Sequence, residues 1–104
     1  KAIFFHFLQP TLYTKINLNE YEESLLDNNH LSPILFKVAN QLAYPIMIES
    51  LQKYEYSKFL VNLFNDTKES VFLDFCHVNH IGNLIIAKAI LESLERNLGL
   101  VRAF

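Results

Sequence analysis

Two short apolar runs stand out in the pattern of hydrophobic and polar positions. Residues 2–8 (AIFFHFL) form an aromatic-rich run that ends at Gln9-Pro10, and residues 58–63 (KFLVNL) form a second one. Short runs with little polar alternation are typical of buried strands in a parallel sheet. Pro10 ends the first run because proline has no N–H donor for the ladder. We therefore expect strands over 2–8 and 58–63, with the first one central in its sheet.

Two helices are predicted between these strands. Residues 19–26 begin with Asn19 and carry Glu22 three positions later, which is the capping-box spacing. Ser32-Pro33 predicts the N-cap and first position of a longer helix, and Pro45 predicts a kink or a junction of two helices within it. The apolar positions of this longer stretch recur at near-helical spacing: Ile34, Leu35, Val38, Leu42, Ile46 and Leu51.

The clearest pattern is that of a C-terminal helix. We expect Asn83 to be its N-cap and Gly99 its C-terminal stop. Its apolar positions recur at steps of three and four, with two isoleucines beside them: Leu84, Ala87, Leu91, Leu94 and Leu98, with Ile86 and Ile90. Residues 71–75 (VFLDF) have the composition of an extended segment. The alternation of strands and helices predicts an α/β fold with a parallel sheet.

Composition excludes several classes of protein. Of the 104 residues, 51% are hydrophobic and 19% charged, so the chain can form a core and is not disordered. The net charge is −2 with both signs interspersed, which argues against a nucleic-acid surface. No apolar run reaches the roughly 18 residues that a bilayer-spanning helix needs. The length fits a single domain over 1–104 or the C-terminal fragment of a larger one, and we expect an upstream portion before Lys1.

The candidate chemistry lies in the stretch 71–90. Asp74 and His77 are three residues apart, and Gly82-Asn83 and an apolar helix follow them. A histidine that acts as general base needs the right tautomer in one orientation, and a carboxylate bonded to its other ring nitrogen supplies both. We expect one tight loop to bring the pair together, with Gly82 leaving room at the loop exit and Asn83 starting the helix that holds it.

Other interpretations of the same residues stay open. His77 fits a histidine bonded to the backbone, and Cys76 fits a small packing residue. A metal site formed by Asp74, Cys76, His77 and His80 is a further alternative, although four ligands within seven residues are cramped. His6, in an apolar strand, fits a core histidine, and His30 lies in a polar loop.

The stretch FLDFCHVNHIGNLIIAKAI resembles the last conserved block of the SGNH (GDSL-type) hydrolases. In that block Asp-x-x-His is followed by a few polar residues, a Gly-Asn pair and an apolar helix containing Ala. Asp74, His77, Gly82, Asn83 and Ala87 occupy these places. Residues 2–12 and 58–69 resemble the family's strand after its third block and the following strand, so the resemblance covers nearly the whole chain in order.

The resemblance implies a three-layer α/β/α, flavodoxin-like fold and ester hydrolysis by a Ser-His-Asp triad without a cofactor. His77 would be the general base, Asp74 its orienting acid, and 71–75 a loop or short turn rather than a strand. The family's nucleophilic Ser and its oxyanion Gly and Asn lie in earlier blocks that have no counterpart in this sequence. The chain would therefore supply the Asp-His part of the site, with an upstream segment or second chain completing it. Its substrate would be a small-molecule ester, such as an acylated carbohydrate or lipid.

Two other classes of function are compatible with the pattern. A non-catalytic α/β interaction module of STAS type also places a strand ending in Asp-Phe, a loop and an amphipathic helix in sequence. Such a module predicts that Asp74 is buried at the end of a paired strand, whereas the hydrolase predicts that it bonds His77 in a cleft. An all-helical repeat fragment that binds protein or RNA is the third alternative, but no 30–45-residue period supports it.

Overall fold

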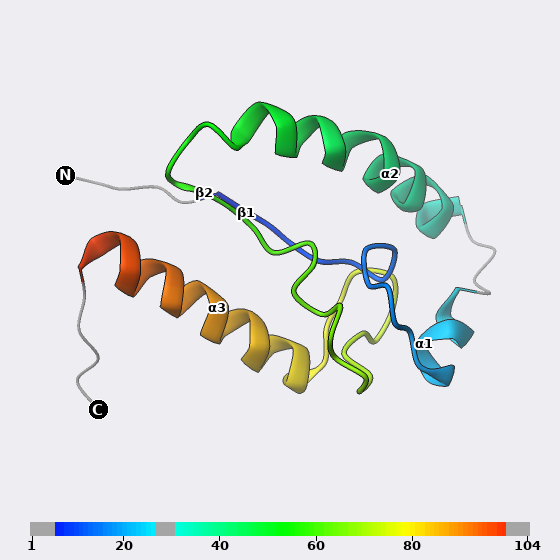
Figure 1. Ribbon diagram of the computed structural model, residues 1–104. Coiled ribbons are helices and arrows are strands. Elements are labelled where there is room, and N and C mark those ends of the chain that lie inside the picture. The colour runs from blue at the N-terminus through cyan, green and yellow to red at the C-terminus, as the bar shows by residue number, and fades with distance from the viewer. Residues whose placement is uncertain (1–5, 27–30, 100–104) are drawn as a thin grey trace.

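The computed structural model describes residues 6–26 and 31–99 (Figure 1). In chain order its elements are β1 (His6–Leu8), α1 (Glu20–Leu25), α2 (Leu31–Leu51), β2 (Ser57–Phe59) and α3 (His80–Leu98). The expected strand at 2–8 is described only from residue 6 onward, because residues 2–5 lie outside the described part.

Strands β1 and β2 pair in parallel, with Phe7 opposite Lys58 and Leu8 opposite Phe59. The hydrogen bond from Leu60 N to Leu8 O, at 2.8 Å, continues the pairing by one residue. The two long helices, α2 and α3, lie on opposite sides of the strand pair (Figure 1). The α/β class with a parallel sheet is thus confirmed, and an all-helical arrangement is wrong for the described residues.

The second strand is shorter than the sequence predicts. It ends at Phe59, and residues 61–66 form consecutive turns instead of continuing to residue 63. Backbone bonds from Leu63 N to Leu60 O (3.0 Å) and from Asn65 N to Asn62 O (3.2 Å) close these turns. The apolar side chains of residues 61–66 therefore belong to turns and not to a strand of the sheet.

The start of α1 agrees with the sequence prediction. The Asn19 side chain accepts from Glu22 N at 2.9 Å, and the Glu22 side chain accepts from Asn19 N at 3.4 Å. This reciprocal pair satisfies two of the backbone donors that a helix start leaves without partners. The capping box is confirmed, and it fixes α1 to begin at Glu20.

Helix α2 differs from the prediction at its start and at Pro45. It begins at Leu31, so Ser32 is a helical residue and not the N-cap. It also runs through Pro45 as one helix to Leu51, so the junction of two helices that was one expectation at Pro45 is not formed. A proline inside a helix removes one backbone bond, and here the helix continues on both sides of it.

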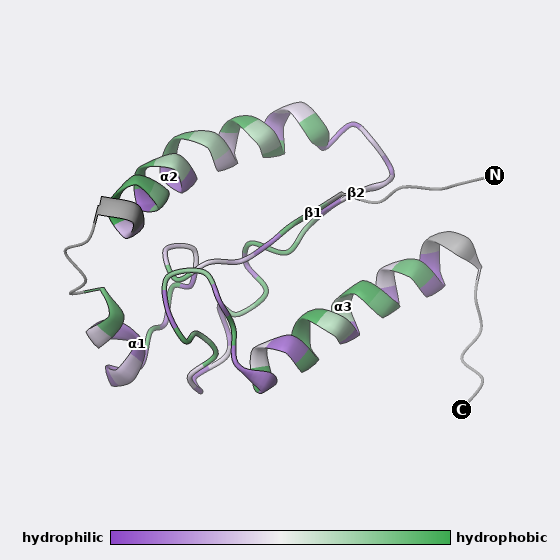
Figure 2. Cartoon of the chain, turned by 180° about the vertical axis from the view of Figure 1, so that it is seen from behind, coloured by the Kyte–Doolittle hydropathy of each residue, from purple (hydrophilic) through white to green (hydrophobic). Residues whose placement is uncertain are grey.

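The apolar stripe expected on α2 faces solvent. The members described as exposed retain between 46% and 66% of their accessible surface: Ile34, Leu35, Val38, Leu42 and Ile46. Hydrophobic positions recur along both long helices in Figure 2. No helix in the described part of the chain is long and apolar enough to cross a membrane.

Polar contacts with residues 9–13 explain this rotation of α2. The buried Asn40 accepts from Thr11 Oγ1 at 3.0 Å, and the Tyr44 hydroxyl donates to Gln9 O at 3.0 Å. The Tyr13 hydroxyl donates to Pro33 O at 3.1 Å. A buried amide such as that of Asn40 is costly without a partner, so these bonds turn Asn40 and Tyr44 toward residues 9–11 and leave the aliphatic stripe outside.

The hydrophobic core lies beside the candidate loop rather than between the long helices. Its buried members are Leu12, Phe64, Val71 and Phe72. The Phe64 and Phe72 rings meet edge to face, with centroids 5.5 Å apart. Partly buried side chains pack around them: Leu18, Leu25, Leu63, Phe75, Val78, Ile81, Ile85 and Ile86. The segment that carries Asp74 and His77 is therefore anchored on both flanks by residues of this core, Val71 and Phe72 before it and Val78 after it.

Candidate functional site

The segment 71–79 folds back on itself as a tight loop. Phe72 and Val78 form an isolated antiparallel bridge, and Leu73 N donates to His77 O at 2.8 Å. Asn79 N donates to Val71 O at 2.9 Å. The extended strand that the composition of 71–75 indicates is wrong, because these residues pair with the loop's own return and not with a neighbouring strand.

Asp74 and His77 meet in this loop. The Nδ1 atom of His77 lies 2.8 Å from Asp74 Oδ2. The other carboxylate oxygen, Oδ1, accepts from the backbone N–H groups of Cys76 at 2.9 Å and His77 at 2.7 Å. An Asp that bonds the backbone two and three residues ahead is a turn-forming residue, so the carboxylate both shapes the loop and orients the imidazole.

The loop perturbs the ionisation of two groups. Partial burial raises the pKa of Asp74, but the backbone donors of His77 and Cys76 and the His77 ring outweigh it and hold the pKa below its ordinary value. Burial, and then the charge of Asp74, raises the pKa of the Cys76 thiol. At neutral pH the site therefore holds an ionised carboxylate next to a protonated thiol, which is a poor nucleophile.

The helix cap after the loop is Asn79 and not Asn83. Helix α3 begins at His80, and the Asn79 side chain accepts from Gly82 N at 3.0 Å. Its amide nitrogen donates to Ser70 O at 2.7 Å, so one side chain joins the helix start to the loop entry. Asn83 lies within the first turn of α3 and is exposed. The prediction of Asn83 as cap is wrong because the helix starts at His80, four residues before the expected apolar pattern begins at Leu84.

Gly82 lies against the loop entry with no space for a side chain. A Cβ atom at this position would be 2.9 Å from Val78 Cβ and 3.0 Å from the carbonyl oxygen of Val71. This approach fixes the rotation of α3, so that Ile81, Ile85 and Ile86 face the core. Of the expected pattern, Ile86 packs there, whereas Leu84 and Leu91 are 69% and 40% exposed. The C-terminal stop at Gly99 is confirmed, with φ at 66° in the left-handed region.

A buried ion pair supports the loop from the side of α1. The Lys15 ammonium bonds the Glu22 carboxylate, both side chains are fully buried, and Lys15 Nζ also donates to Glu69 O at 2.9 Å. Glu22 Oε2 accepts from Val71 N at 3.0 Å.

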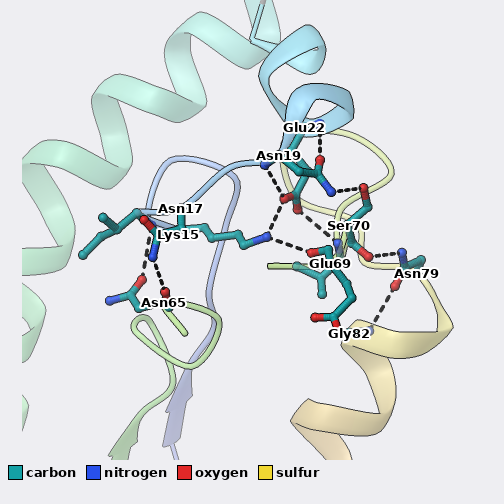
Figure 3. Close-up of polar contacts among 11 residues, drawn as sticks. Lys15, Asn17, Asn19, Glu22, Asn65, Glu69, Ser70, Asn79 and Gly82 are labelled. Carbon is teal, nitrogen blue, oxygen red and sulfur yellow. Dashed lines mark hydrogen bonds and ion pairs between the residues drawn. The ribbon is translucent and has the colours of Figure 1, made fainter. Parts of the chain in front are cut away.

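The same network reaches the start of α3. Asn19 Nδ2 lies 2.5 Å from Ser70 Oγ, and Asn79 bonds Ser70 O (Figure 3). Residues 69–71 are thus held between α1 and α3, immediately before the loop that carries Asp74. Buried charges such as those of Lys15 and Glu22 are costly unless they are paired and hydrogen-bonded, and these contacts supply their partners.

A cavity of about 440 Å³ opens beside His77. Cys76, His77 and Asn83 contribute to its wall, and so does Gln9 after β1. Most of the remaining wall is apolar: Phe7, Pro10, Leu60, Val78, Ile86 and Ile90. An apolar hollow with a few polar groups at its edge is typical of small-molecule sites.

The remaining histidines of the sequence are not brought to the Asp74–His77 pair in the described part of the chain. His80 is the exposed first residue of α3, and the ligand atoms that lie close together in the described residues belong to Asp74, Cys76 and His77. The His6 side chain and His30 lie outside what the structure describes.

Three residues that position the site are not indicated by the sequence pattern: Asn79, Lys15 and Ser70. Asn79 has the N-cap residue type but competes with Asn83, which stands directly before the apolar run. Nothing in the sequence marks Lys15 as buried, because its partner Glu22 is already accounted for by the capping box. Comparisons with family models, with curated proteins and with solved structures find no match to this chain, so its function is inferred from the geometry of the site.

Proposed function

We propose that this chain carries the acid-base part of an SGNH-type ester hydrolase, with His77 as general base and Asp74 as its orienting acid. The observation that carries the proposal is the contact between His77 Nδ1 and Asp74 Oδ2 at 2.8 Å. In a Ser-His-Asp triad the carboxylate accepts from Nδ1–H, and Nε2 then takes the proton of the nucleophile. The loop leaves Nε2 for that role, and the His77 side chain is 75% exposed.

The surroundings of the pair are compatible with this chemistry. The low pKa of Asp74 keeps its carboxylate ionised, so it can stabilise the imidazolium formed when His77 takes a proton. The cavity beside His77 offers apolar walls for the carbon chain of an ester. A raised thiol pKa makes Cys76 a poor alternative nucleophile.

The nucleophile is proposed to come from outside the 104 residues. Within residues 6–26 and 31–99, the polar contacts recorded for the His77 ring are those with Asp74 and Cys76. Ser70, the serine nearest in sequence, bonds Asn19 on the far side of the loop entry. A preceding segment or a second chain with a Gly-Asp-Ser motif would supply the hydroxyl. It would also add the strands that extend β1 and β2 into a flavodoxin-like sheet.

The interaction-module alternative is less well supported by the site. It expects Asp74 to be buried at the end of a paired strand, but 43% of the Asp74 side chain is exposed and the residue lies in a bend. Its carboxylate is occupied with the loop and with His77 rather than left for a partner.

The test is ester hydrolysis by two polypeptides, the 104-residue chain alone and a longer protein that joins it to the proposed serine-bearing segment. With p-nitrophenyl acetate, we expect the chain alone to show no enzymatic turnover. The longer protein should hydrolyse the ester, and His77→Ala and Asp74→Asn should each lower kcat by about 10⁴-fold.

His80→Ala is the matched control, because it removes a neighbouring exposed imidazole that does not contact Asp74. It should leave kcat unchanged. Enzymatic turnover by the isolated chain that His77→Ala abolishes would contradict the need for an external nucleophile. A longer protein whose activity is unaffected by His77→Ala would contradict the proposal itself.

A further inference from the structure

The loop that holds the Asp-His pair also brings together three kinds of metal ligand. A carboxylate oxygen of Asp74, the sulfur of Cys76 and a ring nitrogen of His77 all lie within 4.8 Å of one another. Carboxylate, thiolate and imidazole are the ligands that Zn²⁺ takes in proteins, and this mixture suits borderline divalent ions better than Mg²⁺ or Ca²⁺. The types of donor atom therefore favour Zn²⁺ and similar divalent ions.

The distances from His77 Nδ1 to the other two donors are close to those around a single ion. Cys76 Sγ lies 3.6 Å from His77 Nδ1. With a Zn–S bond of about 2.3 Å and a Zn–N bond of about 2.0 Å, a tetrahedral ion separates sulfur and nitrogen by about 3.5 Å. Asp74 Oδ2, at 2.8 Å from the same nitrogen, needs to move outward by only a few tenths of an ångström to admit an ion, since ligand oxygen and nitrogen lie about 3.3 Å apart in such a site.

The loop also orients the carboxylate in advance. Asp74 Oδ1 accepts from the backbone N–H groups of Cys76 and His77, which leaves Oδ2 directed toward the His77 ring. Such outer bonds hold a ligand in place and strengthen metal sites. The backbone bonds between Leu73 and His77 and between Val71 and Asn79 close the loop independently of any ion. The ligands therefore do not have to be gathered from a flexible segment.

We propose that Asp74, Cys76 and His77 form a binding site for a Zn²⁺-class divalent ion, with water in the fourth position. Binding releases the thiol proton, leaves the imidazole proton on Nε2 instead of Nδ1, and exchanges the Asp74–His77 hydrogen bond for two metal bonds. If the function proposed above holds, an occupied site withdraws His77 from base catalysis, and the ion inhibits the hydrolase reversibly.

The test is a titration of the 104-residue chain with Co²⁺, a spectroscopic substitute for Zn²⁺, under a reductant that does not bind metals. We expect a thiolate-to-cobalt charge-transfer band in the near ultraviolet that saturates at one ion per chain and disappears when Zn²⁺ is added. Cys76→Ser should abolish the band. Asp74→Asn and His77→Ala should each weaken Co²⁺ binding by about tenfold or more.

His80→Ala is the control variant, because His80 adjoins the loop but is not one of the three ligands. It should leave the affinity unchanged. Far-ultraviolet circular dichroism of each variant should match the parent chain, so that loss of binding is not loss of folding. Absence of the band in the parent chain, or a band that persists in His77→Ala at full affinity, would overturn the site.

The titration measures binding and not ester hydrolysis, so the two proposals fail separately. A parent chain without the cobalt band removes the metal site and leaves the hydrolase proposal standing. An inactive longer protein that still binds Co²⁺ through the three residues removes the hydrolase proposal and leaves the metal site.

Discussion

Gly82 approaches Val71 so closely that a Cβ atom at position 82 would lie 3.0 Å from the carbonyl oxygen of Val71. That carbonyl already accepts from Asn79 N, the bond that closes the loop. The first turn of α3 and the loop carrying Asp74 and His77 are thus joined at a contact that only glycine permits.

Gly82→Ala should destabilise the protein although alanine is the better helix former. The propensity gain is about 1 kcal/mol at most in a free helix. The added Cβ atom would clash with Val78 Cβ and the Val71 carbonyl oxygen, and overpacking of this kind costs about 1–3 kcal/mol. Urea denaturation should show a lower free energy of unfolding. An increase in stability would show that the approach of α3 to the loop is looser than described.

Asn79→Ala and Asn83→Ala form a matched pair that tests where α3 begins. Asn79→Ala should lower the free energy of unfolding by about 1–2 kcal/mol, because it removes the cap to Gly82 N and the bond to Ser70 O. Asn83→Ala, in an exposed helical position, should change it by no more than about 0.5 kcal/mol. The reverse order of effects would restore the sequence-based prediction of Asn83 as cap.

Lys15→Met should be strongly destabilising. It leaves the Glu22 carboxylate buried without its charged partner, and breaking a buried pair from one side costs about 3–5 kcal/mol. Lys37→Met, at an exposed position on α2, is the control, with an expected change within about 0.5 kcal/mol. Equal effects of the two variants in urea denaturation would contradict the burial of the pair.

Stability should fall in acid partly through Asp74. Its pKa is below the ordinary value in the folded state, so its contribution is present above the unfolded pKa and is lost as the pH falls through the folded one. Asp74→Asn should therefore reduce the loss of unfolding free energy between pH 7 and pH 3. Asp66→Asn, which removes one exposed carboxylate, is the control. Identical pH profiles for the parent chain and Asp74→Asn would contradict the hydrogen bonds assigned to this carboxylate.

Short sequence patterns were sufficient to predict those features of the fold that depend on residues close together in the chain. The capping box of Asn19 and Glu22, the stop at Gly99 and the order of strands and helices all depend on residues within a few positions of one another. The three-residue spacing of Asp74 and His77 also made their meeting in a tight loop predictable, because the carboxylate can form a turn with its own backbone.

The rotation of the helices was decided by tertiary structure. The aliphatic stripes of α2 and α3 have helical periodicity, but periodicity does not say which face turns inward. Asn40 and Tyr44 bond residues 9–11 and so fix the rotation of α2, while the contact of Gly82 with Val71 fixes that of α3. Both constraints join residues far apart in the chain, and each acts because a buried polar group needs a partner or two backbones need space.

The sequence by itself thus determined the order of strands and helices and the meeting of Asp74 with His77 in a tight loop. It did not determine that Asn79 bonds Ser70 as well as capping α3, or that Lys15 is buried with Glu22. These depend on how the loop entry is held between α1 and α3. The physical reason is that hydrogen-bond partners and close contacts form between segments that only the folded chain brings together.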